Sequence, residues 1–111
     1  MKKIFFVSLA AGFLMSGIVK ADAVAEGKKV AEDRKLGNCL ACHQMDDGKL
    51  PGNIAPPLLA MKQRFPDKKA LRDQIWDPTK KNPHTMMPPF GKHGVLTEEQ
   101  IDKVVEYIHT L

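Results

Sequence analysis

The chain is poor in aromatic residues and in cysteine. Its 111 residues include one Trp, one Tyr, five Phe and two Cys. Three of the phenylalanines fall before residue 24, so the rest of the chain keeps only four aromatic side chains: Phe65, Trp76, Phe90 and Tyr107. Two cysteines exclude a disulfide-rich scaffold, which depends on several bridges. A small domain with so few large side chains has little material for a core, and such domains commonly rely on an added group that staples them together.

The chain also lacks a strong excess of charge. Seventeen basic and 13 acidic residues give a formal charge of +4. Residues 1–23 contain three lysines and one aspartate, which leaves 14 basic and 12 acidic residues, or +2, in residues 24–111. Nucleic-acid-binding surfaces have a dense basic stripe with interleaved aromatics. The sequence has no such stripe, so we expect no nucleic acid partner.

The first 23 residues have the pattern of a secretory signal peptide. Lysines follow Met1, the 16 residues from Ile4 to Val19 carry no charge, and an A-x-A sequence ends at Ala23. We expect cleavage after Ala23, with Ala21 as the second choice, which leaves 24–111 as one domain. The uncharged run is shorter than the roughly 20 residues that span a bilayer, although an uncleaved anchor would look similar. No cysteine lies at the cleavage site, which argues against a lipid anchor. The prediction is a periplasmic protein with no membrane contact after cleavage.

Both cysteines belong to one pentapeptide, Cys39-Leu40-Ala41-Cys42-His43. In an exported chain, C-x-x-C-H indicates covalent attachment of one heme c. Two thiols three positions apart can form thioethers with the two vinyl groups on one edge of a porphyrin, while the adjacent imidazole reaches the iron. The motif therefore predicts Cys39 and Cys42 as attachment sites and His43 as the proximal iron ligand. The buried heme would be the added group that the small core needs.

Other uses of the two cysteines fit the sequence less well. A disulfide between them would close a very short loop and add little stability. A thioredoxin-like redox pair needs a βαβ context, which is missing. A zinc site would need two more ligands at close spacing, whereas His84 and His93 lie nine positions apart.

The C-terminal segment predicts an amphipathic helix. It opens with Thr97-Glu98-Glu99-Gln100, a capping box in which Thr97 and Gln100 satisfy free backbone donors reciprocally. The residues that then follow at helical spacing form one apolar stripe: Ile101, Val104, Val105 and Ile108.

A second helix is predicted from Ala23 to Leu36, where small and apolar residues recur at helical spacing and Gly37 marks the end. Gly27 lies inside this helix and costs about 1 kcal/mol relative to Ala. A glycine tolerated there suggests that another element packs closely against it. We expect the C-terminal helix to cross at Gly27, with Tyr107 covering the gap.

The middle of the chain is rich in proline. All eight prolines lie between residues 51 and 89, which excludes long helices and strands from that region. One short helix remains plausible from about Asp67 to Trp76, with Leu71 and Ile75 on one face and Pro78 as its stop. Two terminal helices with turns and loops between them predict an all-α fold in which the loops wrap a flat apolar cofactor.

The second axial ligand of the iron is expected to be a methionine. Met45 is too close to His43 for the chain to pass round the porphyrin edge, and Met61 is expected to pack in the core. Met86 and Met87 remain, in a loop stiffened by two following prolines. Adjacent side chains of an extended segment point to opposite sides, so only one of the pair can meet the iron, and geometry alone does not choose between them. The two loop histidines named above are weaker nitrogen candidates.

Four segments together go beyond a generic heme protein. Residues 27–43 resemble the heme-attachment segment of the SoxX family, the small monoheme subunits of the sulfur-oxidation cytochrome SoxAX. Residues 52–58 are similar to the next segment of that family, 82–91 to its distal-ligand loop and 96–108 to its closing helix. The resemblance covers nearly all of residues 24–111, and it implies a small class I cytochrome c fold.

The resemblance also implies roles for individual residues. Met87, which stands directly before Pro-Pro, takes the place of the family's axial ligand in preference to Met86. Pro56 takes the place of the residue whose backbone carbonyl accepts a hydrogen bond from the ring N–H of His43, a contact that orients a ligand histidine.

The resemblance implies an electron-transfer function without a catalytic site of this chain's own. SoxAX, an L-cysteine S-thiosulfotransferase, couples thiosulfate oxidatively to a cysteine of the SoxYZ carrier and releases two electrons. The expected partners are a SoxA-type heme subunit in a heterodimer, SoxYZ through that complex, and a soluble cytochrome c acceptor. The alternative is a free periplasmic class I cytochrome c that shuttles electrons without a fixed partner. A small heme peroxidase fits less well, because methionine ligation would leave no open iron site.

Overall fold

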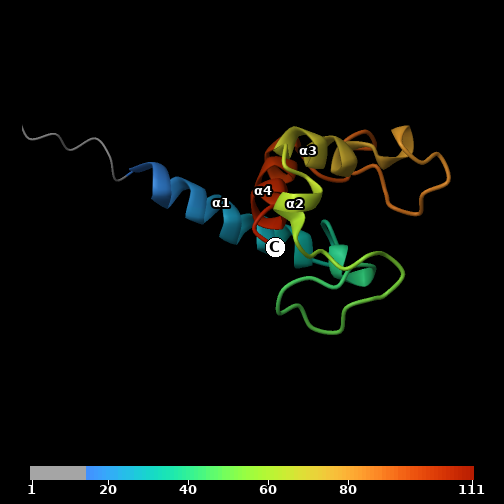
Figure 1. Cartoon of the computed structure of the whole chain (residues 1–111), viewed down its shortest axis with the longest axis horizontal. Coiled ribbons are helices and arrows are strands. Elements are labelled where there is room, and N and C mark those ends of the chain that lie inside the picture. Colours follow the sequence, from blue (N-terminus) through green and yellow to red (C-terminus); the bar gives the residue numbers. More distant parts are fainter. Residues whose placement is uncertain (1–14) are drawn as a thin grey trace, which may run out of the picture.

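Helices connected by long loops make up the structure. This computed structural model describes residues 15–111, and no strand occurs among them. Figure 1 shows a long N-terminal helix that extends away from the rest of the fold. The described residues contain four α-helices and two short 3₁₀ helices: α1 (Met15–Glu32), η1 (Cys39–Ala41), α2 (Met61–Arg64), α3 (Lys68–Trp76), η2 (Pro78–Lys80) and α4 (Glu98–Ile108). The predicted all-α class is confirmed for this part of the chain.

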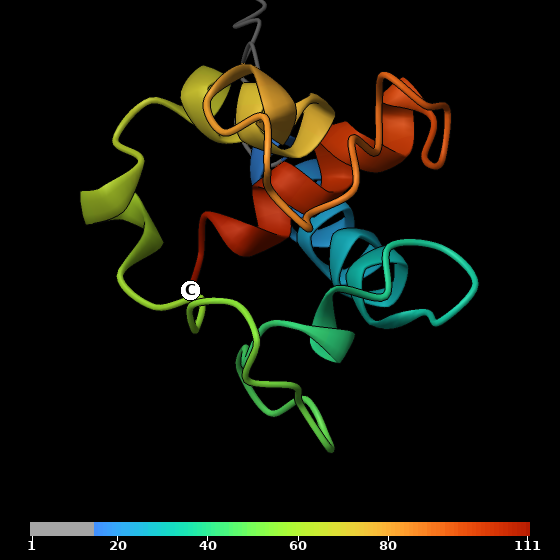
Figure 2. The same cartoon turned by 90° about the vertical axis from the view of Figure 1, so that its right-hand side faces the viewer.

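Helices α1 and α4 cross at a glycine, as the sequence predicted. A Cβ atom at Gly27 would lie 1.9 Å from the backbone oxygen of Lys103 and 3.0 Å from Cβ of Tyr107. Ala31, one turn further along α1, is fully buried in the same core. Figure 2 shows the two helices crossing at the centre of the fold, with α3 packed beside α4. The crossing is this close because neither small residue holds the helices apart.

The start of α4 has the predicted capping box. The backbone N–H of Gln100 donates to the Thr97 hydroxyl at 3.1 Å, and the Thr97 N–H donates to the Gln100 side-chain oxygen at 3.0 Å. The whole apolar stripe of the helix is buried, together with Tyr107. Burial raises the pKa of the Tyr107 hydroxyl to about 12, because the charged phenolate is poorly solvated there.

Helix α1 ends four residues earlier than predicted. It stops at Glu32, and a turn follows before the cysteines. The carboxylate of Asp33 accepts the N–H of Lys35 at 2.8 Å, and the Asp33 carbonyl accepts the N–H of Leu36 at 3.1 Å. These local bonds offer the backbone an alternative to the helix. The N–H of Gly37 donates back to Val30 at 3.1 Å, which keeps the turn against the helix end.

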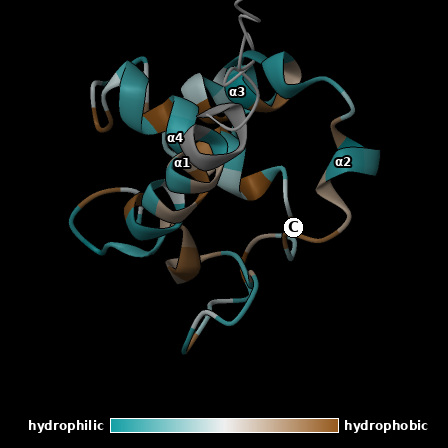
Figure 3. Ribbon diagram, turned by 90° about the vertical axis from the view of Figure 1, so that its left-hand side faces the viewer, coloured by the Kyte–Doolittle hydropathy of each residue, from teal (hydrophilic) through white to brown (hydrophobic). Residues whose placement is uncertain are grey.

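Helix α3 begins and ends where the sequence predicted. The Asp67 side chain caps it by accepting the N–H of Lys69 at 2.9 Å. The helix stops at Trp76, and Pro78 opens the next 3₁₀ turn. Leu71 and Ile75 are buried. In Figure 3 the ribbons of α3 and α4 carry both hydrophilic and hydrophobic residues, as expected of helices with one buried face.

Ion pairs join α4 to the two helices packed against it. Arg72 of α3 pairs with Asp102 at 2.7 Å, and Lys68 pairs with Glu106 at 2.9 Å. Lys103 pairs with Glu26 of α1. Each exposed pair contributes little on its own, but together they fix the register of α4 between its neighbours.

The predicted signal peptide lies largely outside the described residues. Residues 1–14 are not described, and the expected cleavage site at Ala23 lies within α1. Among residues 15–111, no helix combines the length and the apolar character needed to cross a membrane.

The substitution Gly27→Ala tests the close crossing of α1 and α4, because the crossing decides whether the change stabilises or destabilises the protein. In an ordinary exposed helix this change stabilises by about 1 kcal/mol. Here the new methyl group would collide with the backbone of α4, so we expect a net destabilisation of about 1–3 kcal/mol. Urea unfolding of the heme-containing protein measures it, with Lys29→Ala on the exposed side of α1 as a near-neutral control. A more stable Gly27→Ala protein would contradict the crossing.

Candidate heme site

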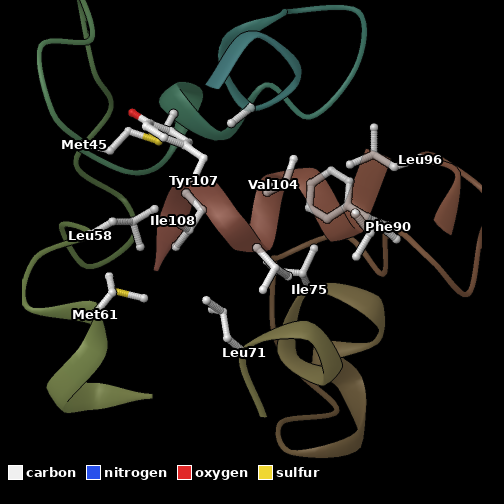
Figure 4. Close-up of a cluster of buried hydrophobic side chains, with 13 residues drawn as sticks. Met45, Leu58, Met61, Leu71, Ile75, Phe90, Leu96, Val104, Tyr107 and Ile108 are labelled. Carbon is white, nitrogen blue, oxygen red and sulfur yellow. The ribbon is translucent and has the colours of Figure 1, made fainter. Parts of the chain in front are cut away.

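A cavity of about 230 Å³ lies between α3, α4 and the loops that precede them. Its walls are mainly apolar side chains from all of these segments. Figure 4 shows several of them pointing toward a common space: Leu58, Met61, Leu71, Ile75 and Ile108. Ligand pockets are typically lined by apolar side chains with a few polar groups, and this cavity has that character.

The C-x-x-C-H segment closes one side of this cavity. Its first residues form η1, and the N–H of His43 donates to the carbonyl of Cys39 at 2.9 Å. Cys39 and His43 line the cavity, whereas Cys42 is half-buried next to it. The two cysteines are not joined to each other in a disulfide. Burial raises the pKa of the Cys39 thiol to about 11, because the thiolate is poorly solvated there.

The His43 ring is held in one orientation by a backbone carbonyl. Its Nδ1–H donates to the Pro56 oxygen at 2.6 Å, the contact that the resemblance implied. Because Nδ1 carries the proton, Nε2 keeps the lone pair that can bind a metal. The loop that brings Pro56 to the ring is itself hydrogen-bonded to the C-x-x-C-H segment. The backbone N–H of Gly52 donates to the carbonyl of Leu40 at 2.7 Å, and the N–H of Ala55 donates to the carbonyl of Cys42 at 3.0 Å.

The loop with the two adjacent methionines forms the other side of the cavity. Met87 is half-buried in the lining, whereas Met86 is 79% exposed. The backbone N–H of Met87 donates to the Thr85 hydroxyl at 3.1 Å. The two loop histidines, His84 and His93, are exposed and do not line the cavity. Of the two adjacent methionines, which their spacing from His43 left equivalent, the structure thus places only Met87 in the lining of the cavity.

The other two methionines considered as ligands are core residues. Met45 and Met61 are each 1% exposed. Met45 lies near Tyr107, as Figure 4 shows, and does not line the cavity. Met61 begins α2 and lines the cavity among aliphatic side chains. Their burial agrees with the prediction of core packing for Met61.

The residues around the cavity fit a covalently attached heme. Cys39, His43 and Met87 all line the cavity, and most of the other lining side chains are apolar. Sulfur and imidazole donors of this kind are the ligands that c-type heme iron takes from proteins.

Three polar residues of the lining had no place in the sequence prediction: Arg64, Gln74 and Thr85. Gln74 could have been found, because it follows Leu71 by three positions and so lies on the apolar face of its helix. Arg64 lies three positions after Met61, in the short helix α2. It could not have been found from the sequence, because its guanidinium donates to the carbonyl of Pro57 at 3.0 Å, and a loop contact of this kind leaves no sequence pattern.

A comparison with known protein families assigns this chain to one of them. The family model of cytochrome c matches residues 24–111. The chain belongs to the cytochrome c family. This cytochrome has the small all-α class I fold and carries covalently attached heme c with its iron, as the sequence predicted. Its electron-transfer character follows from the family.

Two individual proteins are similar to this cytochrome. A chain in the crystal structure of SoxXA from P. pantotrophus is 30% identical, with a TM-score of 0.70, and the match covers 78% of this chain and 80% of that one. An uncharacterized lipoprotein of Aquifex aeolicus (strain VF5) is 40% identical over 76 residues, which are 68% of this chain and 37% of the relative. This chain thus spans just over a third of that relative's length. The match to SoxXA confirms the resemblance to SoxX.

Proposed function

We propose that this cytochrome is the SoxX-type electron-transfer subunit of a SoxAX-type thiosulfate-oxidising L-cysteine S-thiosulfotransferase. The observation that carries the proposal is the similarity to a chain of SoxXA over more than three quarters of both chains, at 30% identity. The four sequence segments that resemble SoxX support it, because they include the methionine loop and not only the common heme motif.

In this proposal Cys39 and Cys42 would hold the heme covalently, and His43 and Met87 would bind its iron. When bound, the heme supplies one-electron redox chemistry at its iron. The Pro56 carbonyl keeps the imidazole of His43 in the orientation that points Nε2 toward the iron. Mainly apolar side chains would surround the heme, and Met87 is favoured over Met86 because it alone of the two lines the cavity.

The proposed role in the complex is to receive and pass on electrons. Oxidative coupling of thiosulfate to a cysteine of the SoxYZ carrier releases two electrons, and the bond-forming step belongs to the SoxA-type heme subunit, the partner in the heterodimer. This chain relays the electrons to a soluble cytochrome c. Its only two cysteines are committed to the heme, so it offers no thiol for the coupling reaction.

The proposed location is the periplasm, after signal cleavage following Ala23. Lys20, Ala21 and Asp22 are exposed, whereas Val24 packs against the core. Cleavage at this point would therefore remove these three exposed residues and keep Val24. The Aquifex relative is named a lipoprotein, and both cysteines of this chain lie in the heme motif.

A free class I shuttle is the second candidate function. One observation favours it: every proposed heme ligand comes from this chain, so the heme site is complete without a partner subunit.

Met87→Ala tests the distal ligand. A thioether favours ferrous iron relative to nitrogen ligands, so its loss should lower the reduction potential and abolish the sulfur-to-iron charge-transfer band. Met86→Ala is the matched control and should leave both unchanged. Visible spectroscopy with a redox titration measures the two properties. If the sulfur-to-iron charge-transfer band stayed intact in Met87→Ala, that result would contradict the assignment of Met87 as the distal ligand.

Gly52→Ala tests the proximal side. A Cβ atom at this position would lie 1.9 Å from the backbone oxygen of Ala41, so the loop must move and the hydrogen bond from His43 to Pro56 must lengthen. That bond increases the basicity of a ligand histidine and so favours ferric iron; weakening it should raise the potential. The exposed neighbour Asn53→Ala is the control. A potential that stays at the wild-type value, with the loop shown to have moved, would contradict the role of Pro56.

Association with a SoxA-type subunit tests the function itself. The mature protein should co-purify with that subunit, and thiosulfate with SoxYZ should reduce its heme only when the subunit is present. The absorbance of the reduced heme is the readout. A stable monomer that never associates, and whose heme stays oxidised under these conditions, would favour the free shuttle.

A further inference from the structure

The loop that carries Met87 leaves helix α3 and returns to the same point. The backbone N–H groups of Gly91 and Lys92 donate to the carbonyl of Trp76, the last residue of α3, at 3.1 and 3.2 Å. The approach is close, because a Cβ atom at Gly91 would lie 2.0 Å from the Trp76 ring. The two ends of the loop are therefore held together at its base.

A buried carboxylate lies at this base. Asp77, which directly follows α3, is the only charged residue that is buried among residues 20–111. Its Oδ1 accepts the backbone N–H of Thr79 at 3.1 Å and also the Thr79 hydroxyl. Its Oδ2 lies 3.7 Å from Nζ of Lys92. A buried carboxylate is unfavourable unless it is paired, so the lysine at the returning end of the loop stabilises the charge at the starting end.

We propose that Asp77 and Lys92 are positioning residues whose ion pair holds the base of this loop closed and thereby keeps Met87 on the heme iron. When the base opens, Met87 leaves the iron and a small nitrogen ligand can bind in its place. The inference deepens the proposed function, because it rests on Met87 being an axial ligand. An electron carrier needs such a closed site, since an open coordination position would admit side reactions at the iron.

The α3 side of the base is fixed to the rest of the fold. The guanidinium of Arg72 lies 5.2 Å from the centre of the Trp76 ring and pairs with Asp102 of α4 at 2.7 Å. The contacts of Asp77 with Thr79 also stay on this side. The contact with Lys92 instead crosses to the returning segment, so opening of the loop must break it.

The ion pair can be tested from both of its ends. Asp77→Asn keeps an oxygen for Thr79 but loses the charge that attracts Lys92, and Lys92→Gln removes the other charge. A ligand that binds only the open form has an apparent affinity reduced by the fraction that is open. Each variant should therefore bind imidazole at its ferric iron about twofold to fivefold more tightly than the wild type, the range for a partly exposed ion pair. The double variant should gain no more than either single one, because both changes remove the same interaction.

Two matched controls separate this role from a general loss of stability or of charge. Lys68→Gln breaks the ion pair of α3 with Glu106, at 2.9 Å, far from the base of the loop in the sequence. Lys80→Gln removes an exposed charge from the loop itself. Both should leave the affinity for imidazole unchanged, even if Lys68→Gln unfolds at a lower urea concentration.

The measurement is a titration of the purified ferric proteins with imidazole, followed by the loss of the sulfur-to-iron charge-transfer band. Unchanged affinity in Lys92→Gln, which alters an exposed side chain, would overturn the proposal even if Asp77→Asn failed to fold. An equal gain in Lys68→Gln or Lys80→Gln, or additive gains in the double variant, would overturn it as well. A band absent from the wild-type protein before imidazole is added would instead overturn the axial role of Met87, so the two failures are distinguishable.

Discussion

The interior of this protein is organised around a space that its own side chains do not fill. Helices α3 and α4 and the loops before them line a cavity of about 230 Å³ with mainly apolar side chains. Without a heme, these apolar side chains would be exposed to water, which is unfavourable in proportion to the exposed area. Small domains have only about 5–15 kcal/mol of stability in total. The heme of this cytochrome is thus a structural part of the core as well as the redox group, and the covalent thioethers keep it there.

The rest of the fold positions the segments that line the cavity. Helices α1 and α4 cross at Gly27 and form a scaffold that brings the C-x-x-C-H segment to one side of the cavity. Helix α3, tied to α4 by the ion pair of Arg72 with Asp102, supports the methionine loop on the other side. The proposed electron-transfer role needs this arrangement, because a rigid site changes little when the charge on the iron changes.

Patterns set by local chemistry predicted most of this architecture. The capping box at Thr97, the glycine at position 27 and the stop at Pro78 each depend on neighbouring residues and fixed spacing, and the structure agrees with all three. The end of α1 was predicted four residues too late, because the turn depends on bonds to Asp33 that compete with the helix. The choice between Met86 and Met87 came from resemblance, since spacing alone treated them alike. The spacing of Gln74 from Leu71 would have placed it on the apolar face of its helix, but its contact with Met87 joins segments that sequence patterns do not relate.

The dependence of the fold on heme is tested most directly by removing the two thiols. The double variant Cys39→Ser and Cys42→Ser, matured without covalent heme, should lose most of its far-ultraviolet circular dichroism and show no cooperative unfolding transition. The wild-type protein, purified in the same way, should show both a Soret band and a cooperative transition. A double variant that contains no heme, yet keeps the helical signal and unfolds at the same urea concentration as the wild type, would contradict the account.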